Sequence, residues 1–358
     1  MRILFVASSM GYGGAERVIS LLSNELCSRG HEVGIYLTRV SDKCAYELDE
    51  RITVYSEKTI RNTIGVIKGI RNYVKRFSPD IVVPFMTFQC MFTTMALMFS
   101  KFPVVVCERN DPNTIDGKPA PKYVFWVRDF LFSIAEGAVF QTPGARDMFS
   151  RSIIKKSKVI PNPIDSSVLP EPYEGKRDNR IVNVGRLSVQ KNQQMLISAF
   201  AEIKDEFPEV SVEIYGDGNK GAELEALSES LGVAERVHLM GNVTGVCDYI
   251  KNARAFAFTS NFEGMPNALA EAMAIGLPCV TTDCPPGGAR MLVRDGENGL
   301  LVPCNDVEGF ANALRSVLSD AQNAEKLGSN ASKIRGLLSV SKIVTEWEEY
   351  FSKIISKQ

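Results

Sequence analysis

The chain has 358 residues, of which 45% are hydrophobic and 23% are charged, and its formal net charge is −1. This composition excludes a disordered or low-complexity chain and allows two globular domains of about 170 residues each. The eight cysteines are scattered and form no Cys-x-x-Cys pair, which favours reduced thiols over disulfides or a zinc site. The apolar run after Met1 breaks at Ser8, and no other apolar stretch reaches about 18 residues, so we expect a cytoplasmic protein that is neither secreted nor membrane-spanning.

The charge is distributed unevenly along the chain. Residues 1–170 contain 22 Lys and Arg against 16 Asp and Glu, whereas residues 171–358 contain 19 against 26. The basic half is therefore predicted to meet an anionic partner.

The chain opens with a strand–helix–strand pattern, predicted over residues 2–7, 15–27 and 32–37. Between the first strand and the helix, Gly13 and Gly14 allow backbone N–H groups to approach an anion. This segment does not match the G-x-G-x-x-G fingerprint, and the second strand is not followed by the acidic residue that would bind a ribose. The opening therefore disfavours a nicotinamide-dependent dehydrogenase.

A basic amphipathic helix is predicted over residues 58–77. Its apolar side is predicted to consist of Ile64, Ile67, Ile70 and Val74. Its other side carries Arg61, Lys68, Arg71, Lys75 and Arg76. This basic side is typical either of a solvated helix face or of a surface that meets anionic lipid headgroups.

Two further strands are predicted at residues 80–85 and 104–107. The second leads into Glu108 and Arg109, at the sheet edge where ligands of α/β proteins bind. At this position Arg109 can bind a phosphate, bind an acceptor or pair with Glu108. The two histidines, His31 and His238, fall in a helix-to-strand turn and in a strand, so neither is expected to act in catalysis.

A proline-rich hinge follows at Pro161, Pro163, Pro170 and Pro172, and a new strand and helix series begins at residue 180. The next strand ends at Gly185 and Arg186, and Lys191 precedes a helix predicted over residues 192–207. Two cations beside a helix N-terminus suit a pyrophosphate leaving group, because negative charge develops there in the transition state.

The segment from Asn261 to Pro278 has the clearest pattern of a ligand site, since a short helix lies between two buried strands. Pro266 is expected at the first helical position, and Gly276 is expected to end the helix. The helix N-terminus attracts phosphate or sugar oxygens. Glu263 precedes the helix and Glu271 lies within it, so both can face one long ligand. Either glutamate alone would be more typical of a helix-dipole partner or a solvated face, and it is the pair in this position that favours a ligand site.

The tail from Val340 to Gln358 places Ile343, Trp347, Phe351 and Ile354 on one stripe of a helix, which must dock on another surface.

Four segments in this order resemble glycosyltransferase family 4 of the bacterial surface-polysaccharide type: residues 13–17, 185–192, 261–278 and 295–299. The resemblance implies the α/β fold named GT-B, in which two Rossmann-like domains face a central cleft. The acceptor-binding domain is expected at residues 1–168 and the donor-binding domain at 169–340. A C-terminal helix at 341–358 is expected to cross back onto the N-terminal domain.

The resemblance also implies roles for individual residues. Arg186 and Lys191 are expected on the pyrophosphate, Glu263 on the sugar hydroxyls and Glu271 on the ribose, with the first three forming the catalytic set. Further donor contacts are expected from Gly13, Gly14, Gly264, Met265, Pro266, Asn267, Ala268 and Leu269. Glu16 and Arg109 are expected to bind the acceptor. Many relatives carry histidine near the position of Arg109, and this departure argues against a catalytic imidazole here.

The predicted function is retaining transfer of a hexosyl or N-acetylhexosaminyl unit from a nucleotide-diphosphate sugar to a glycan, lipid-diphosphate-linked, in capsule or lipopolysaccharide synthesis. UDP is favoured over GDP. No Asp-x-Asp occurs, and neither a metal nor another cofactor is expected. The enzyme is expected as a peripheral protein on the inner face of the cell membrane, without a nucleic-acid partner. The alternatives are a sugar-nucleotide epimerase of similar shape, a GDP-sugar-dependent transferase and an inactive carbohydrate-binding relative.

Overall fold

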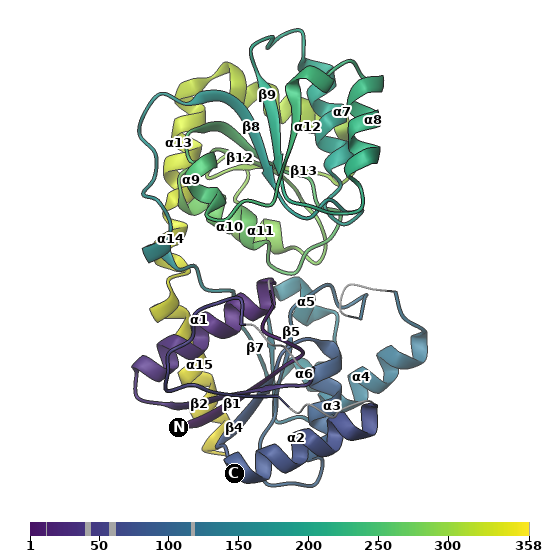
Figure 1. Ribbon diagram of the computed structural model, residues 1–358, viewed down its shortest axis with the longest axis vertical. Coiled ribbons are helices and arrows are strands. Elements are labelled where there is room, and N and C mark those ends of the chain that lie inside the picture. Colours follow the sequence, from purple (N-terminus) through teal and green to yellow (C-terminus); the bar gives the residue numbers. More distant parts are fainter. Residues whose placement is uncertain (12, 40–43, 57–61, 116–118, 358) are drawn as a thin grey trace. The chain divides into compact units, whose positions relative to one another are not determined.

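The computed structural model describes residues 1–11, 13–39, 44–56, 62–115 and 119–357. The chain divides into two compact units, which we call the first unit (residues 1–163 and 338–358) and the second unit (residues 164–337). Each unit is built on parallel strands with helices packed around them, as Figure 1 shows. The predicted α/β class is therefore confirmed.

The first unit contains a parallel sheet of strand order β3-β2-β1-β4, which continues through bridges of Val82 with Val104 and Phe85 with Cys107 into a sheet of order β5-β6-β7. The strands are β1 (Arg2–Ala7), β2 (Glu32–Leu37), β3 (Thr53–Ser56), β4 (Ile81–Pro84), β5 (Val105–Glu108), β6 (Gly137–Phe140) and β7 (Ser157–Val159). The helices are α1 (Gly14–Ser28), α2 (Thr63–Phe77), α3 (Thr87–Leu97), α4 (Lys122–Ile134), α5 (Pro143–Asp147), α6 (Arg151–Ile154) and α15 (Val340–Ile355). Strands β1 and β2 have the predicted bounds.

Helix α2 differs from its prediction at its start. Its first residue is Thr63, and the Asn62 side chain caps it by accepting a hydrogen bond from the Gly65 N–H (2.8 Å). Ile64, predicted on the buried side, is 65% exposed, because the buried face is formed one turn later by Ile70, Val74 and the unpredicted Tyr73 and Phe77. The basic side is exposed as predicted at Lys68, Arg71, Lys75 and Arg76, whereas Arg61 lies outside the described residues.

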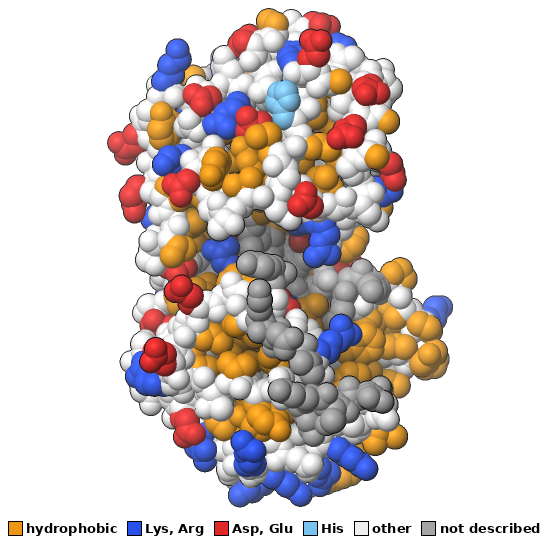
Figure 2. Space-filling model, in the orientation of Figure 1, with side chains coloured by type: hydrophobic (Ala, Val, Ile, Leu, Met, Phe, Trp, Pro, Cys, Tyr) orange, Lys and Arg blue, Asp and Glu red, His pale blue; other side chains and the backbone are white. Residues whose placement is uncertain are grey.

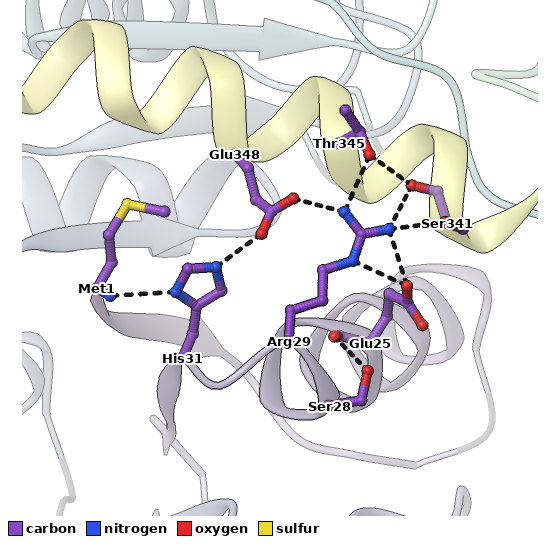
Figure 3. Close-up of polar contacts among 8 residues, drawn as sticks. All are labelled: Met1, Glu25, Ser28, Arg29, His31, Ser341, Thr345 and Glu348. Atoms are coloured by element: carbon purple, nitrogen blue, oxygen red, sulfur yellow. Dashed lines mark hydrogen bonds and ion pairs between the residues drawn. The ribbon is translucent and has the colours of Figure 1, made fainter.

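Helix α15 belongs to the first unit, as the predicted crossing of the tail requires. All four side chains of the predicted apolar stripe are buried, and Trp347 is fully enclosed. Figure 3 shows the polar contacts at one end of the interface with α1: Glu348 accepts a hydrogen bond from Arg29 (2.5 Å) and lies 2.7 Å from Nε2 of His31. Nδ1 of His31 lies 3.1 Å from the Met1 amino group. Burial raises the pKa of Glu348, but the hydrogen bonds from His31 and Arg29 outweigh it and the net pKa is lowered.

The second unit is built on one parallel sheet of strand order β10-β9-β8-β11-β12-β13. The strands are β8 (Asp178–Val184), β9 (Ser211–Tyr215), β10 (Val237–Gly241), β11 (Ala253–Phe258), β12 (Cys279–Thr282) and β13 (Leu300–Val302). The helices are η1 (Ser166–Val168), α7 (Gln193–Ile203), α8 (Gly221–Ser230), η2 (Ala234–Arg236), α9 (Val246–Ile250), α10 (Asn267–Ala274), α11 (Gly288–Leu292), α12 (Val307–Ser319), α13 (Ala321–Ser332) and α14 (Ile334–Leu337). Because all strands are parallel, the loops after β8, β11 and β12 meet at the same sheet edge.

Across the described ranges, none of the helices combines the length and the apolar character that crossing a membrane would require.

Candidate active site

The loops that follow β8 and β11 are bound to each other at the carboxyl edge of the second unit's sheet. The Asn261 N–H donates to the carbonyl oxygen of Gln190 (2.8 Å), and the Gln190 side chain donates to the carbonyl oxygen of Phe262 (3.0 Å). The side-chain amide of Asn192 donates to that of Asn261 (3.0 Å). These bonds fix the loop that carries Lys191 against the loop that carries Glu263.

Lys191 and Glu263 form an ion pair within these loops. Nζ of Lys191 lies 2.6 Å from Oε1 of Glu263, and only 19% and 10% of the two side chains are exposed. The Ser260 hydroxyl donates to the same carboxylate oxygen (3.0 Å), and the Lys191 ammonium lies 5.0 Å from the centroid of the Phe258 ring. The two residues were predicted on different parts of the ligand, and their direct pairing is a finding of the structure. A cation and an anion are thus held, mutually neutralised, at the sheet edge.

Helix α10 begins immediately after the Glu263 loop. Pro266, predicted at the first helical position, lies one residue earlier, at the N-cap, because its ψ of 98° is extended. Its side chain makes no capping hydrogen bond to the first turn, and the positive end of the helix dipole lies at this point of the loop. Gly276, with φ of +76°, ends the helix as predicted.

The loop between β12 and α11 packs against the loop that carries Glu263. The Glu263 N–H donates to the carbonyl oxygen of Pro285 (2.9 Å). A Cβ at Gly288 would lie 1.8 Å from the carbonyl oxygen of Gly264, so the two loops can approach only because residue 288 is glycine. The orientation of Glu263 is therefore set by three loops of the sheet edge.

The other predicted donor residues of the second unit differ in how far they are exposed. Arg186 directly follows the Gly185 turn, and its exposed side chain forms no hydrogen bond or ion pair with any residue that the structure describes. Asn267, Ala268 and Glu271 are half-buried on α10. Gly264, Met265, Pro266 and Leu269 are buried, so that Met265 and Leu269 can meet a ligand chiefly through their backbone.

Glu16, predicted to bind the acceptor, lines a pocket of the first unit. The carboxylate folds back over the N-terminus of α1, where a Cβ at Gly13 would lie 2.2 Å from Oε2 of Glu16. Burial raises the pKa of Glu16. The pocket has a volume of about 650 Å³, and its lining includes Ser8, Thr38, Arg39, Phe88 and Gln89. Gly14 is exposed at the first position of α1.

Arg109, the other predicted acceptor residue, does not line this pocket and is buried. Its guanidinium lies 4.5 Å from the Phe85 ring centroid and 5.4 Å from that of Trp347. It donates to the side-chain oxygen of Asn162 (3.2 Å), and burial lowers its pKa. Its role in acceptor binding remains a prediction.

Sequence reasoning assigned no individual role to two residues of the candidate active site, Ser260 and Asn261, although Asn261 opens the segment predicted to bind a ligand. Polar side chains directly after a buried strand were the available signal, since such residues reach the sheet edge where ligands bind. In the described part of the chain, no group of three or more His, Cys, Asp or Glu side chains is arranged to hold a metal ion.

Two family models match adjoining parts of the chain. The model described as Glycosyltransferase Family 4 matches residues 12–168, and the one described as Glycosyl transferases group 1 matches residues 170–334. The chain belongs to glycosyltransferase family 4. This confirms the predicted enzyme class, a glycosyltransferase, and argues against the alternative predictions of an epimerase and a dehydrogenase.

Relatives with similar lengths are known in bacteria. The chain is 26% identical, over 99% of both chains, to a Campylobacter jejuni "GalNAc-alpha-(1->4)-GalNAc-alpha-(1->3)-diNAcBac-PP-undecaprenol alpha-1,4-N-acetyl-D-galactosaminyltransferase". It is 28% identical to the lipopolysaccharide 1,6-galactosyltransferase of Salmonella typhimurium, over 89% of this chain and 90% of the relative. Among solved structures, HepE of Anabaena with UDP and glucose matches with a TM-score of 0.83 and 21% identity, over 98% of this chain and 99% of HepE. The GT-B fold is thus confirmed.

Proposed function

We propose that this glycosyltransferase moves a hexosyl or N-acetylhexosaminyl unit from a UDP-sugar to a lipid-diphosphate-linked glycan, with retention of the anomeric configuration. The observation that carries the proposal is the Lys191–Glu263 pair at the carboxyl edge of the sheet, where the Glu263 loop leads into the N-terminus of α10. A cation and a helix N-terminus together can bind a diphosphate, and a carboxylate can accept hydrogen bonds from the hydroxyl groups of a sugar. The UDP bound to HepE and the undecaprenol-linked acceptor in the Campylobacter enzyme's name support the choice of substrates.

In the proposed reaction the acceptor hydroxyl attacks the anomeric carbon from the face that the diphosphate leaves. The bond between the anomeric carbon and the phosphate oxygen breaks, and the hydroxyl proton passes to the departing phosphate. Arg186, Lys191 and the N-terminus of α10 stabilise the charge that develops on the diphosphate. Glu263 orients the sugar by accepting hydroxyl hydrogen bonds, and Glu271 binds the ribose.

The pocket of the first unit is the proposed acceptor site. Its volume of about 650 Å³ lies in the range of small-molecule sites, and Glu16 and Arg39 offer an acceptor and a donor for sugar hydroxyls. The acceptors in the relatives' names are lipid-linked or lipopolysaccharide glycans, so the enzyme is proposed to act peripherally at the inner face of the cell membrane. Contact of Gly13 and Gly14 with the donor stays a prediction.

Product analysis tests the proposal. UDP-hexoses, UDP-N-acetylhexosamines and the matching GDP-sugars are first compared by thermal shift, because a ligand that binds the folded state raises its stability. NMR of the early product with the best donor then shows the anomer. We expect retention, and residual activity with retention for Glu263→Gln, because glutamine keeps the shape and part of the hydrogen bonding. An inverted product, or a glycosyl adduct on Glu263 trapped with a fluorinated donor, would contradict the mechanism.

A further inference from the structure

Helix α4 exposes a row of large apolar side chains. Tyr123, Trp126, Phe130 and Ile134 recur at helical spacing on its outer side, and Trp126 is 73% exposed. Helix α3 packs beside α4, and the residues at its end contribute Met98 and Phe99, the latter 95% exposed. We call this surface the α3–α4 face. Figure 2 shows hydrophobic side chains gathered over α4, toward the right edge of the view.

The α3–α4 face is not a poorly packed core. The other side of α4 is firmly held, since Leu131 and Phe132 are buried and the Arg128 guanidinium donates to the carbonyl oxygen of Pro112 (2.5 Å) and lies 4.6 Å from the Phe149 ring centroid. The exposed aromatic row is therefore additional to a complete buried side. An exposed patch of this kind marks a docking surface.

The face is also hollowed by an apolar pocket of about 290 Å³. The lining includes Leu97, Met98, Phe99, Phe102, Phe130 and Ile134. The pocket thus opens among the exposed side chains, and its lining is mostly apolar, with Glu136 as its one charged residue.

Cations border the face. Lys122 begins α4, and Lys101 lies beside Phe102, with its ammonium 5.6 Å from the ring centroid. Helix α2 packs beside α3 and exposes Lys68, Arg71 and Lys75. Residues 81–100, which include α3, contain no charged residue, so α3 itself adds no negative charge to the face. The acid of α4, Asp129, is paired with Arg128 (2.8 Å). Aromatic side chains bordered by lysine and arginine match the headgroup region of an anionic bilayer, where aromatic rings insert and cations remain at the phosphates.

We propose that the α3–α4 face is the membrane-docking surface of this enzyme, with Tyr123, Trp126 and Phe130 inserted among the lipids of an anionic bilayer and α2 held at the headgroups. The proposal rests on the proposed function in one respect, because a lipid-linked acceptor gives the enzyme a reason to bind a bilayer. It differs from docking by the basic helix alone, in which no side chain would enter the apolar region.

The chain provides its own probe for this insertion. It has two tryptophans, and Trp347 is fully buried, so a lipid-dependent change in emission reports on Trp126. The full-length protein is mixed with vesicles of phosphatidylethanolamine and phosphatidylglycerol that carry bromine on the acyl chains near the headgroups. We expect a blue shift and bromine quenching, and Trp126→Phe should abolish the quenching while vesicle binding persists. No donor or acceptor is present, so this result is independent of the transfer reaction.

Substitutions separate insertion from electrostatic attraction. Tyr123→Ser/Trp126→Ser/Phe130→Ser should weaken vesicle binding by about tenfold or more, because it removes most of the inserted apolar area. Lys68→Gln/Arg71→Gln/Lys75→Gln should weaken binding chiefly at low salt and leave Trp126 quenched in the bound protein. Tyr249→Ser removes an exposed aromatic side chain of the second unit and should change nothing.

Three results would overturn the proposal. The first is vesicle binding that the three-serine variant retains. The second is bound protein in which bromine leaves Trp126 unquenched. The third is a dimer in sedimentation that the three-serine variant converts to a monomer without change in vesicle binding, which would assign the face to a second copy of the chain. Transfer to a water-soluble acceptor should be equal in the wild type and the three-serine variant, so loss of docking and loss of catalysis are measured separately.

Discussion

A double-mutant cycle on Lys191 and Glu263 tests whether their pairing stabilises the unliganded protein. At 2.6 Å and an effective dielectric constant of about 20, the Coulomb attraction is about 6 kcal/mol. Desolvation of two mostly buried charges offsets much of it, and the Ser260 hydroxyl still donates to Glu263 when Lys191 is removed. We therefore expect Lys191→Met to lower the free energy of unfolding by about 2 to 3 kcal/mol, and the double variant with Glu263→Gln to recover about 2 kcal/mol of coupling. Urea denaturation followed by far-UV circular dichroism measures both.

The same variants have opposite expected effects on UDP binding. In the free protein Lys191 is neutralised by Glu263, so a diphosphate must share this cation with the carboxylate. Glu263→Gln removes the competing anion and should tighten UDP binding about fivefold, which corresponds to about 1 kcal/mol. Lys191→Met removes the cation and should weaken binding about tenfold or more. Isothermal titration calorimetry with UDP alone gives both constants without any contribution from the sugar.

A matched control comes from an exposed ion pair of the same unit. Arg315 and Glu206 lie 2.7 Å apart but are 37% and 46% exposed, so Arg315→Met should cost at most about 1 kcal/mol and leave UDP binding unchanged. A coupling energy near zero for the Lys191–Glu263 cycle, together with weaker UDP binding in Glu263→Gln, would refute the idea that Glu263 competes with the diphosphate for Lys191.

Four further outcomes follow from the site and the tail. Arg186→Ala should lower kcat by about a hundredfold, which corresponds to about 3 kcal/mol, without changing the urea midpoint, because the side chain is exposed and forms no hydrogen bond or ion pair with the residues that the structure describes. Glu271→Ala should raise the KM for the donor with little effect on kcat, since ribose contacts are alike in the ground and transition states; a defect in kcat alone would exclude that role. Activity should persist in EDTA, and strict dependence on Mg²⁺ would show that cations other than Arg186 and Lys191 serve the diphosphate. The pKa of Glu348 is lowered from its usual 4.5, so its stabilising effect should be complete above pH 4.5 and be lost as the pH falls below it; Glu348→Gln should remove this part of the pH dependence of unfolding.

Elements with a strong local pattern were predictable from the sequence. Continuous apolar runs predicted the bounds of β1 and β2 correctly. All four side chains that were predicted on the apolar stripe of α15 are buried. Errors arose where local sequence rules allow the same feature to fall at either of two neighbouring positions in the chain. The fixed φ of Pro266 suits both the N-cap and the first helical position, and its ψ decides between them only in the folded chain. Ile64 fits the apolar period of α2, but it lies in the first turn, ahead of the buried contacts of the helix.

The pairing of Lys191 with Glu263 could not be predicted from local patterns, because 72 residues separate them. It depends on the strand order, in which β11 lies directly beside β8 and brings their following loops together. Each loop was recognisable as a ligand loop on its own. Their mutual bonds, through Gln190 and Asn261, required the sheet.

The distribution of charge shows why local geometry, more than net charge, must decide where an anion binds. The proposed diphosphate site lies in the half of the chain that has 26 Asp and Glu against 19 Lys and Arg, whereas the basic half carries its exposed cations on α2 and beside the α3–α4 face. Net charge acts over a screening length of about 10 Å at 0.1 M salt, so it suits an extended target such as a lipid surface. A single diphosphate is bound by groups within about 3 Å, here proposed as Arg186, Lys191 and a helix terminus. The uneven charge of the sequence is therefore informative about the membrane surface, and the motifs at the sheet edge are informative about the donor.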